Sequence, residues 1–189
     1  MSDLIYPVEP APLVKGTKYI RSSEMLPIVD AYGTVTAQAP RSYCHGPMRP
    51  LHPVVHLHII DREGRIFLQK RSATKKMYPN VWDTAVGGHV SYGEYVREAL
   101  FREAREELGL FDFNPIHLET YIYESAFERE LIFVFASVGH FDVHPDRDEV
   151  EEGRYWTIPE IVSNVGTGML TANFEHEFAR FRTALLSLL

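Results

Sequence analysis

The sequence predicts an α/β fold in which a mixed β-sheet lies between helices, an α/β/α sandwich. The runs 54–60, 65–70 and 130–140 are short, apolar and rich in β-branched or aromatic residues, which is typical of strands. The stretch 94–108 has a helical period of apolar residues, and 173–188 has a second such pattern. Short strands interrupted by one long helix and closed by another favour a layered α/β domain.

The N-terminal part differs in character from the rest of the chain. Residues 1 to about 22 include three prolines and no sustained period, so we expect an irregular arm. Two apolar runs flank Asp30–Gly33 within 24–40, which predicts a β-hairpin. We therefore expect an arm and hairpin over 1–50, which could extend the sheet or mediate a homodimer, and the main domain over 51–189.

The main domain begins with a loop and a strand that are both rich in histidine. Residues 40–53 contain several prolines and a glycine, which predicts a loop at the rim of a site. In the strand 54–60, His56 and His58 share a face with Val54 if side chains alternate, so we expect both rings on the less buried side. Histidines in such strands are more often hydrogen-bonded than metal-bound.

The C-terminal third predicts one loop, one strand and two helices. The acidic segment 142–153 is expected to be a loop, and a strand is expected to begin at Tyr155. Pro159 suits the first turn of a short helix. Asn173 is a candidate N-cap for the closing amphipathic helix.

Composition narrows the classes of function. The 189 residues carry a formal net charge of −7 and no basic run, which argues against a nucleic-acid polymer as partner. A single cysteine, Cys44, excludes an internal disulfide framework. No apolar run has the ~18 residues of a membrane span, and the first residues lack a signal-peptide pattern. We expect a cytoplasmic protein without a membrane partner.

The stretch Gly88–Leu110 contains the acids that matter most for function. Glu103, Glu106 and Glu107 would lie on one flank of a helix, where like charges repel one another. A divalent metal ion is a simple compensation, and the alternative is a solvated face paired with arginines. Three arginines are available for such pairs: Arg97, Arg102 and Arg105.

This stretch resembles the signature of the Nudix hydrolases. Gly88 is followed after five residues by Glu94, and after seven more by the block REAREELGL from Arg102 to Leu110. Every fixed position of the signature is filled. The resemblance implies a Nudix-type α/β/α sandwich over 51–189, and it leaves the substrate open because the motif covers a small part of the chain.

The resemblance also implies roles for individual residues. Glu103, Glu106 and Glu107, with the main-chain oxygen of Gly87, would hold Mg²⁺ or Mn²⁺, which prefer oxygen ligands. Arg102 would hold a helix glutamate in place, and Arg102 and Glu106 form an i, i+4 pair. Glu103 is our candidate for the group that takes the proton of the attacking water. Three acids in the 146–152 loop remain alternative bases: Glu149, Glu151 and Glu152.

A second resemblance, to the subgroup of Nudix proteins that includes isopentenyl-diphosphate isomerases, involves further residues. It implies that Arg71 and Lys75 bind a diphosphate. It also implies a histidine metal site, for which the matching residues are His45, His52 and His89, with His89 ranked after the carboxylates as a ligand. One position departs from the pattern. The isomerase cysteine precedes the Gly-His pair, and this chain has Gly87 there, while Cys44 lies elsewhere in the sequence.

Three hypotheses about function follow. The first is metal-dependent hydrolysis of a small diphosphate-containing metabolite, such as a nucleoside diphosphate linked to another group, by attack of water on phosphorus. The second is isopentenyl-diphosphate isomerase-like activity or prenyl diphosphate binding. The third is a non-catalytic ligand-sensing module. The sequence leaves open the substrate, the number of metal ions, the oligomeric state and whether the three histidines bind metal.

Overall fold

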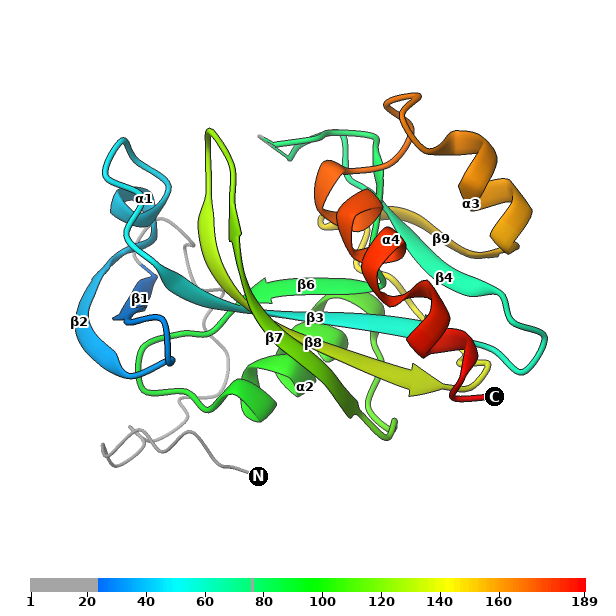
Figure 1. Cartoon of the computed structure of the whole chain (residues 1–189), viewed down its shortest axis with the longest axis horizontal. Coiled ribbons are helices and arrows are strands. Elements are labelled where there is room, and N and C mark those ends of the chain that lie inside the picture. The colour runs from blue at the N-terminus through cyan, green and yellow to red at the C-terminus, as the bar shows by residue number, and fades with distance from the viewer. Residues whose placement is uncertain (1–23, 76) are drawn as a thin grey trace. The chain divides into compact units, whose positions relative to one another are not determined.

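The computed structural model describes residues 24–75 and 77–189, so the expected arm at 1–22 lies outside the described residues. The elements in chain order are β1 (Met25–Val29), β2 (Val35–Pro40), α1 (Arg41–Cys44), β3 (His52–Ile60), β4 (Ile66–Arg71), β5 (Trp82–Asp83), β6 (Val86–His89), α2 (Val96–Leu108), β7 (Ile116–Glu124), β8 (Arg129–Val138), β9 (Val150–Trp156), α3 (Ile158–Asn164) and α4 (Ala172–Leu186) (Figure 1). None of the helices in these residues is long and apolar enough to span a membrane.

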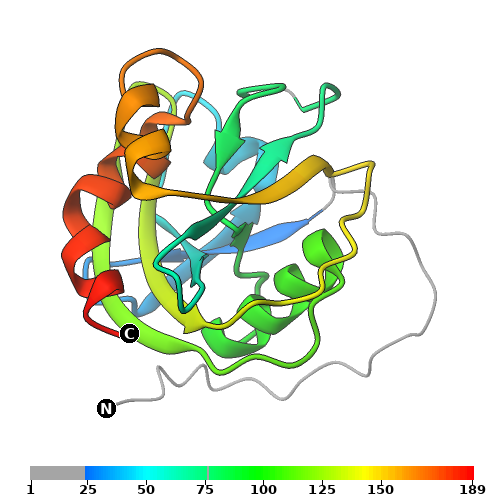
Figure 2. The ribbon, with the colours of Figure 1, turned by 90° about the vertical axis from the view of Figure 1, so that its right-hand side faces the viewer.

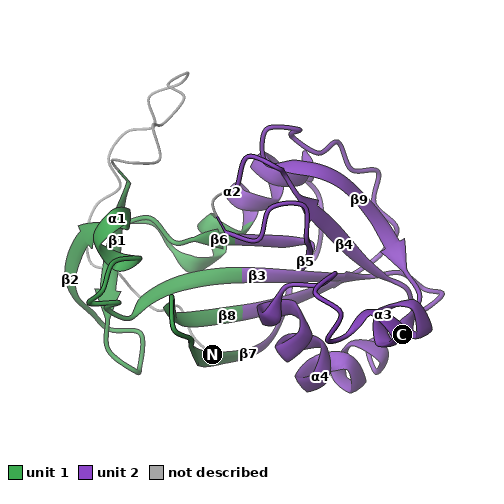
Figure 3. Ribbon diagram, turned by 90° about the horizontal axis from the view of Figure 1, so that it is seen from above, with its two compact units in different colours: residues 1–55, 88–100, 120–133 green, residues 56–87, 101–119, 134–189 purple. Residues whose placement is uncertain are grey.

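The strands form a two-stranded sheet, β1-β2, and a seven-stranded sheet whose main order is β5-β4-β3-β8-β7. Strand β6 pairs with β3, and β9 pairs with β4. The predicted fold class, an α/β fold that combines a mixed sheet with helices, is confirmed. The chain divides into two compact units, unit 1 (residues 1–55, 88–100 and 120–133) and unit 2 (56–87, 101–119 and 134–189) (Figure 3). The predicted domain boundary at residue 50 stays a prediction.

Unit 1 contains the predicted hairpin. Strands β1 and β2 pair antiparallel, and Oδ1 of Asp30 accepts hydrogen bonds from the backbone N–H groups of Tyr32 and Thr34 at 2.9 Å each, which closes the turn. One face of the hairpin packs on the one-turn helix α1, where Cys44 is fully buried with Leu26. Burial raises the pKa of the Cys44 thiol to about 11, so this cysteine behaves as a small apolar core residue.

Unit 2 corrects one predicted boundary. Strand β9 begins at Val150, within the segment 142–153 that was expected to be a loop, and it pairs antiparallel with β4 along its length. The charges of this segment conceal the strand in the sequence, because only its end residues Val150 and Trp156 are buried whereas Glu151 and Glu152 are exposed. Pairing with β4 satisfies the backbone groups of an otherwise polar sequence.

Helix α2 forms where the signature predicts it. Ala99, Leu100, Ala104 and Leu108 are fully buried. Gly109 has a φ of +61°, so it ends the helix in the left-handed conformation that glycine adopts easily. The loop that leads to β9, yellow in Figure 2, runs past this helix. The backbone N–H of His144 donates to the carbonyl of Leu108 at 2.7 Å, and that of Asp146 donates to the carbonyl of Glu107 at 3.0 Å.

The two C-terminal helices begin at threonines. Thr157 and Glu160 form a capping box at α3. The N-cap of α4 is Thr171, whose hydroxyl accepts from the backbone N–H of Phe174 at 3.2 Å, so the expectation of Asn173 is wrong by two residues. The Thr171 hydroxyl also donates to Oδ1 of Asp83 in β5 at 2.7 Å, and this tertiary contact fixes where the helix starts.

The expectation that His56 and His58 lie on the less buried side of their strand is wrong. Both residues are buried, because β3 is covered on both faces. Nδ1 of His56 and Nε2 of His58 contact the two carboxylate oxygens of Glu177 from α4 at 2.8 and 2.7 Å. Burial alone would raise the pKa of Glu177, but the charges and hydrogen bonds of the two histidines hold it well below its usual range.

We predict that Glu177→Gln lowers the free energy of unfolding by about 2 to 4 kcal/mol at neutral pH, because it removes a buried charge from its partners. A carboxylate with a lowered pKa stabilises the fold above its unfolded pKa of about 4.3, and this contribution is lost as the pH falls. Urea titrations should therefore show the difference from wild type shrinking below that pH. Glu63→Gln, at an exposed turn, is the control, and equal stability of all three proteins contradicts the prediction.

Candidate functional site

Helix α2 places the three predicted acids in two different environments. Glu103 and Glu107 are buried, whereas the Glu106 side chain is 44% exposed. Nη1 of Arg102 lies 2.7 Å from Oε1 of Glu103 and 3.3 Å from Oε2 of Glu106. The predicted i, i+4 pair is present, and Arg102 also contacts the buried neighbour. Arg102 therefore holds two of the acids on one guanidinium.

The third acid, Glu107, is held by groups from two strands. Its Oε2 accepts hydrogen bonds from Nε2 of Gln69 in β4 at 2.9 Å and from the backbone N–H of Gly87 in β6 at 3.2 Å. Gly87 was expected near these acids, and the structure brings it into contact with Glu107. Gln69 was missed. Its signal in the sequence is an uncharged polar residue within the apolar strand 65–70.

Burial opposes ionisation of these acids. Desolvation raises the pKa of Glu103 to about 7, with Arg102 lowering it and Glu107 raising it. Desolvation also raises the pKa of Glu107, although Lys75, Gln69 and Gly87 act in the opposite direction. Two buried carboxylates on one helix are thus electrostatically under-compensated by the protein alone. Carboxylate oxygens such as these fit a hard divalent cation such as Mg²⁺ or Mn²⁺.

The two basic residues predicted to bind diphosphate lie in unit 2 with these acids, and both lower the pKa of Glu107. Nη1 of Arg71 donates to Oδ2 of Asp83 at 3.1 Å. Lys75 forms an ion pair with Glu149. The structure therefore brings Arg71, Lys75 and the acidic helix into one neighbourhood.

The three alternative bases differ in their surroundings. The side-chain carboxylate of Glu149 contacts Lys75. Its main-chain carbonyl oxygen accepts a hydrogen bond from the backbone N–H of Ser72 at 3.1 Å. Glu151 and Glu152 are exposed on β9. Of the three acids, Glu149 is therefore the one that forms an ion pair with Lys75, which is predicted to bind the diphosphate.

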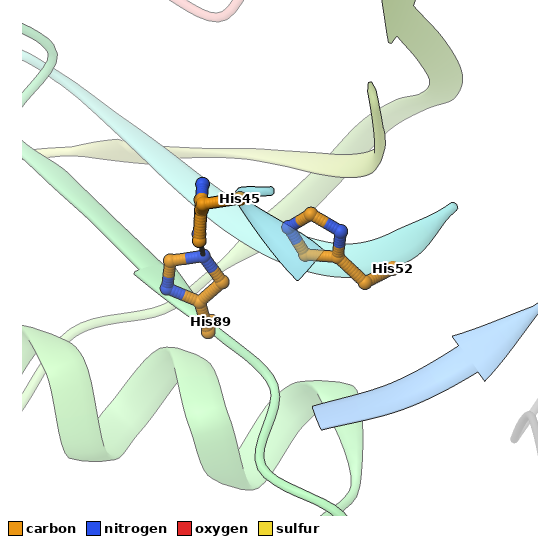
Figure 4. A group of neighbouring side chains, drawn as sticks. All are labelled: His45, His52 and His89. Atoms are coloured by element: carbon orange, nitrogen blue, oxygen red, sulfur yellow. Dashed lines mark hydrogen bonds between the residues drawn. The ribbon is translucent and has the colours of Figure 1, made fainter. Parts of the chain in front are cut away.

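A separate cluster in unit 1 consists of the histidines of the second resemblance (Figure 4). One ring nitrogen from each of His45, His52 and His89 lies within 4.8 Å of the others, and Nε2 of His45 is 2.9 Å from Nε2 of His89. Among residues 24–75 and 77–189, no other set of three or more histidine, cysteine or acidic side chains converges as closely. The three glutamates of α2 are more widely spread than these rings.

His52 is oriented as a metal ligand would be. Its Nδ1 donates to the carbonyl of Pro50 at 2.9 Å, which leaves the lone pair on Nε2. That buried Nε2 has no hydrogen-bond partner among the described residues, and the nearest carboxylate oxygen, Oε1 of Glu130, is 3.9 Å away. Desolvation lowers the pKa of His52, and desolvation together with the charge of His52 lowers that of His45 to about 4. Neutral imidazoles are the form that binds metal.

Glu130 is a second residue that the sequence analysis missed. It is 5% exposed and opens the otherwise apolar run 130–140. The feature of the sequence that could have indicated Glu130 is an acidic residue at the start of an apolar strand.

Comparison with known proteins gives one consistent result. The NUDIX domain family matches residues 50–175. An isopentenyl-diphosphate Delta-isomerase of Mycolicibacterium vanbaalenii is 31% identical over 138 residues, which cover 69% of this chain and 76% of that protein. An uncharacterized Nudix hydrolase of Listeria monocytogenes is 32% identical over 113 residues, 59% of this chain and 66% of that protein. A crystal structure of a Deinococcus radiodurans protein superposes with a TM-score of 0.70 at 22% identity, covering 83% of this chain and 98% of that chain.

We predict that the histidine cluster binds a transition-metal ion and that His52→Asn weakens this binding at least about 10-fold, because it removes a buried nitrogen donor. Titration with Co²⁺, followed by its visible absorption, measures the effect. His140→Asn, at an exposed position of unit 2, is the control. Equal Co²⁺ spectra for the two variants, or no Co²⁺ binding by the wild type, would show that the three rings only pack together.

Proposed function

Because the chain belongs to the Nudix family and resembles its isopentenyl-diphosphate isomerase-like members, we propose that it hydrolyses a small diphosphate-containing metabolite in a reaction that needs Mg²⁺ or Mn²⁺. The substrate class is a nucleoside diphosphate linked to another group. The enzyme is a Nudix hydrolase, so the ligand-sensing hypothesis is set aside.

One observation carries the proposal. Glu103 and Glu107 are buried close together on α2, desolvation raises the pKa of both, and the residues that hold them in place come from three separate elements. Burying two acids in this way is unfavourable for the fold. Such an arrangement supports a function in which a cation and a phosphate substrate complete the site.

The ligands proposed for the cation are carboxylate oxygens of α2 and the main-chain oxygen of Gly87. When bound, the cation supplies positive charge that stabilises the phosphate oxygens and the leaving group. The proposed carboxylate ligands are Glu103, Glu106 and Glu107.

Arg71 and Lys75 are proposed to bind the diphosphate oxygens. Arg71 is suited to this task because Asp83 fixes its guanidinium, and a guanidinium can offer two parallel donors to one phosphate. Lys75 would exchange its partner Glu149 for phosphate. Arg102 keeps Glu103 and Glu106 in place through the contacts at 2.7 and 3.3 Å.

Glu103 is proposed as the base that takes the proton of the attacking water at a carboxylate oxygen. Before a cation is bound, desolvation raises its pKa to about 7, and a carboxylate at this position can accept a proton from water. Glu149 is the alternative, because displacement from Lys75 would free its carboxylate.

The cytoplasmic location and the homodimer stay predictions.

The second candidate function is isopentenyl-diphosphate isomerase-like activity, and the histidine cluster favours it. The relative in Mycolicibacterium vanbaalenii bears the name of that enzyme. The resemblance to isomerases implies a catalytic cysteine thiol, and this chain has no counterpart for it at that position. Gly87 has no side chain, and Cys44 is fully buried with a pKa near 11, so neither supplies a thiolate. Hydrolysis therefore remains the leading proposal.

We predict Mg²⁺-dependent release of phosphate or of a monophosphate from at least one member of a panel of nucleoside diphosphate derivatives and prenyl diphosphates. Glu103→Gln and Glu107→Gln should each lower kcat by about 10² or more, because they remove the base and a ligand. Glu98→Gln, on the exposed side of the same helix, should keep the wild-type rate. Full activity of Glu107→Gln would contradict the proposal.

The isomerase candidate is tested by incubating the wild type and Gly87→Cys with isopentenyl diphosphate in Mg²⁺ and in Zn²⁺. We expect no dimethylallyl diphosphate from the wild type, because a proton donor is absent at residue 87. Product from the wild type at a rate that exceeds diphosphate hydrolysis would reverse the ranking of the two functions.

A further inference from the structure

Gln69 has an amide in an unusual position. It lies on β4 between Leu68 and Lys70, opposite Asp83 of β5 on one side and Gly153 of β9 on the other. The residue is 3% exposed. A neutral polar side chain buried this deeply normally has both ends hydrogen-bonded.

One end of the amide is fixed by Glu107. An ionised carboxylate only accepts hydrogen bonds, so the contact at 2.9 Å joins the NH₂ group of Gln69 to Oε2 of an ionised Glu107. The same oxygen accepts the backbone N–H of Gly87 at 3.2 Å. Two donors on Oε2 fix the rotation of the carboxylate and leave Oε1 as the oxygen better able to face a ligand.

The other end of the amide has no partner. Oε1 of Gln69 is buried and makes no hydrogen bond within residues 24–75 and 77–189. Rotating the amide to exchange its ends would place this oxygen against the Glu107 carboxylate, which is unfavourable. The unpaired oxygen is therefore a consequence of the contact with Glu107, and it lies beside the acid that is under-compensated.

We propose that Gln69 is a positioning residue of the cation site: its Nε2 fixes Glu107, and its Oε1 is a neutral oxygen donor for the bound divalent cation or the water around it. This inference rests on the proposed function. An amide oxygen is a ligand that hard cations accept, and unlike a third buried acid it adds no negative charge. Leucine would fill the same space and provide neither contact.

The test measures metal binding directly. Mn²⁺ is titrated into the full chain and followed by electron paramagnetic resonance and calorimetry, for wild type, Gln69→Leu, Gln69→Asn and Glu107→Gln. The relevant site is the one whose binding Glu107→Gln removes, which separates it from any binding at the histidines. Gln69→Leu and Gln69→Asn should weaken Mn²⁺ binding at that site about 10- to 100-fold. The exposed Gln38→Leu should leave it unchanged.

Thermal unfolding separates positioning from a structural role. Without metal, Gln69→Leu should unfold within a few degrees of wild type, because it loses a hydrogen bond but also removes an unpaired oxygen. Gln69→Asn keeps the amide and is too short to reach Glu107, so it serves if the leucine variant fails to fold. Wild-type Mn²⁺ affinity in a folded Gln69 variant overturns this inference alone. Absence of Mn²⁺ binding at the Glu107 site in the wild type overturns the proposed function together with it.

Discussion

The cost of burying negative charge on helix α2 is the constraint that organises unit 2. Glu103 and Glu107 lie among the fully buried Ala104 and Leu108, and desolvation raises the pKa of both acids. The protein compensates in part, with Arg102 from the same helix and with amide donors from β4 and β6. The remaining imbalance is what a divalent cation would relieve, because its charge acts strongly where water is excluded. The cost of burying these carboxylates therefore explains both the hydrogen bonds that they accept and the cation that we propose for the site.

The two units contain different kinds of side chain that could coordinate a metal ion. Unit 1 has three converging imidazoles, of which His52 offers a buried lone pair, and nitrogen donors of this kind suit transition metals. Unit 2 has carboxylate and amide oxygens, which suit Mg²⁺ or Mn²⁺. By sequence resemblance alone, the histidines match the isomerase-like subgroup and the acids match the Nudix signature.

The sequence predicts those parts of the fold that depend on local patterns. The hairpin at 24–40 follows from two apolar runs that flank a turn, and the helix that ends at Gly109 follows from its helical period and a glycine stop. The acids of α2 follow from a dense motif. The failures involve contacts between distant residues. Strand β9 starts early because β4 pairs with it, and His56 is buried because Glu177, 121 residues later, meets it. Gln69 escaped notice for the same reason, since its importance lies in a contact with Glu107, 38 residues away.

The most direct measurement of the central claim is anomalous X-ray scattering from crystals of the wild type grown with MnCl₂. We expect a manganese peak within bonding distance of carboxylate oxygens of Glu103 or Glu107. Manganese found only between the three histidines, with the α2 carboxylates in contact with protein groups alone, would contradict it.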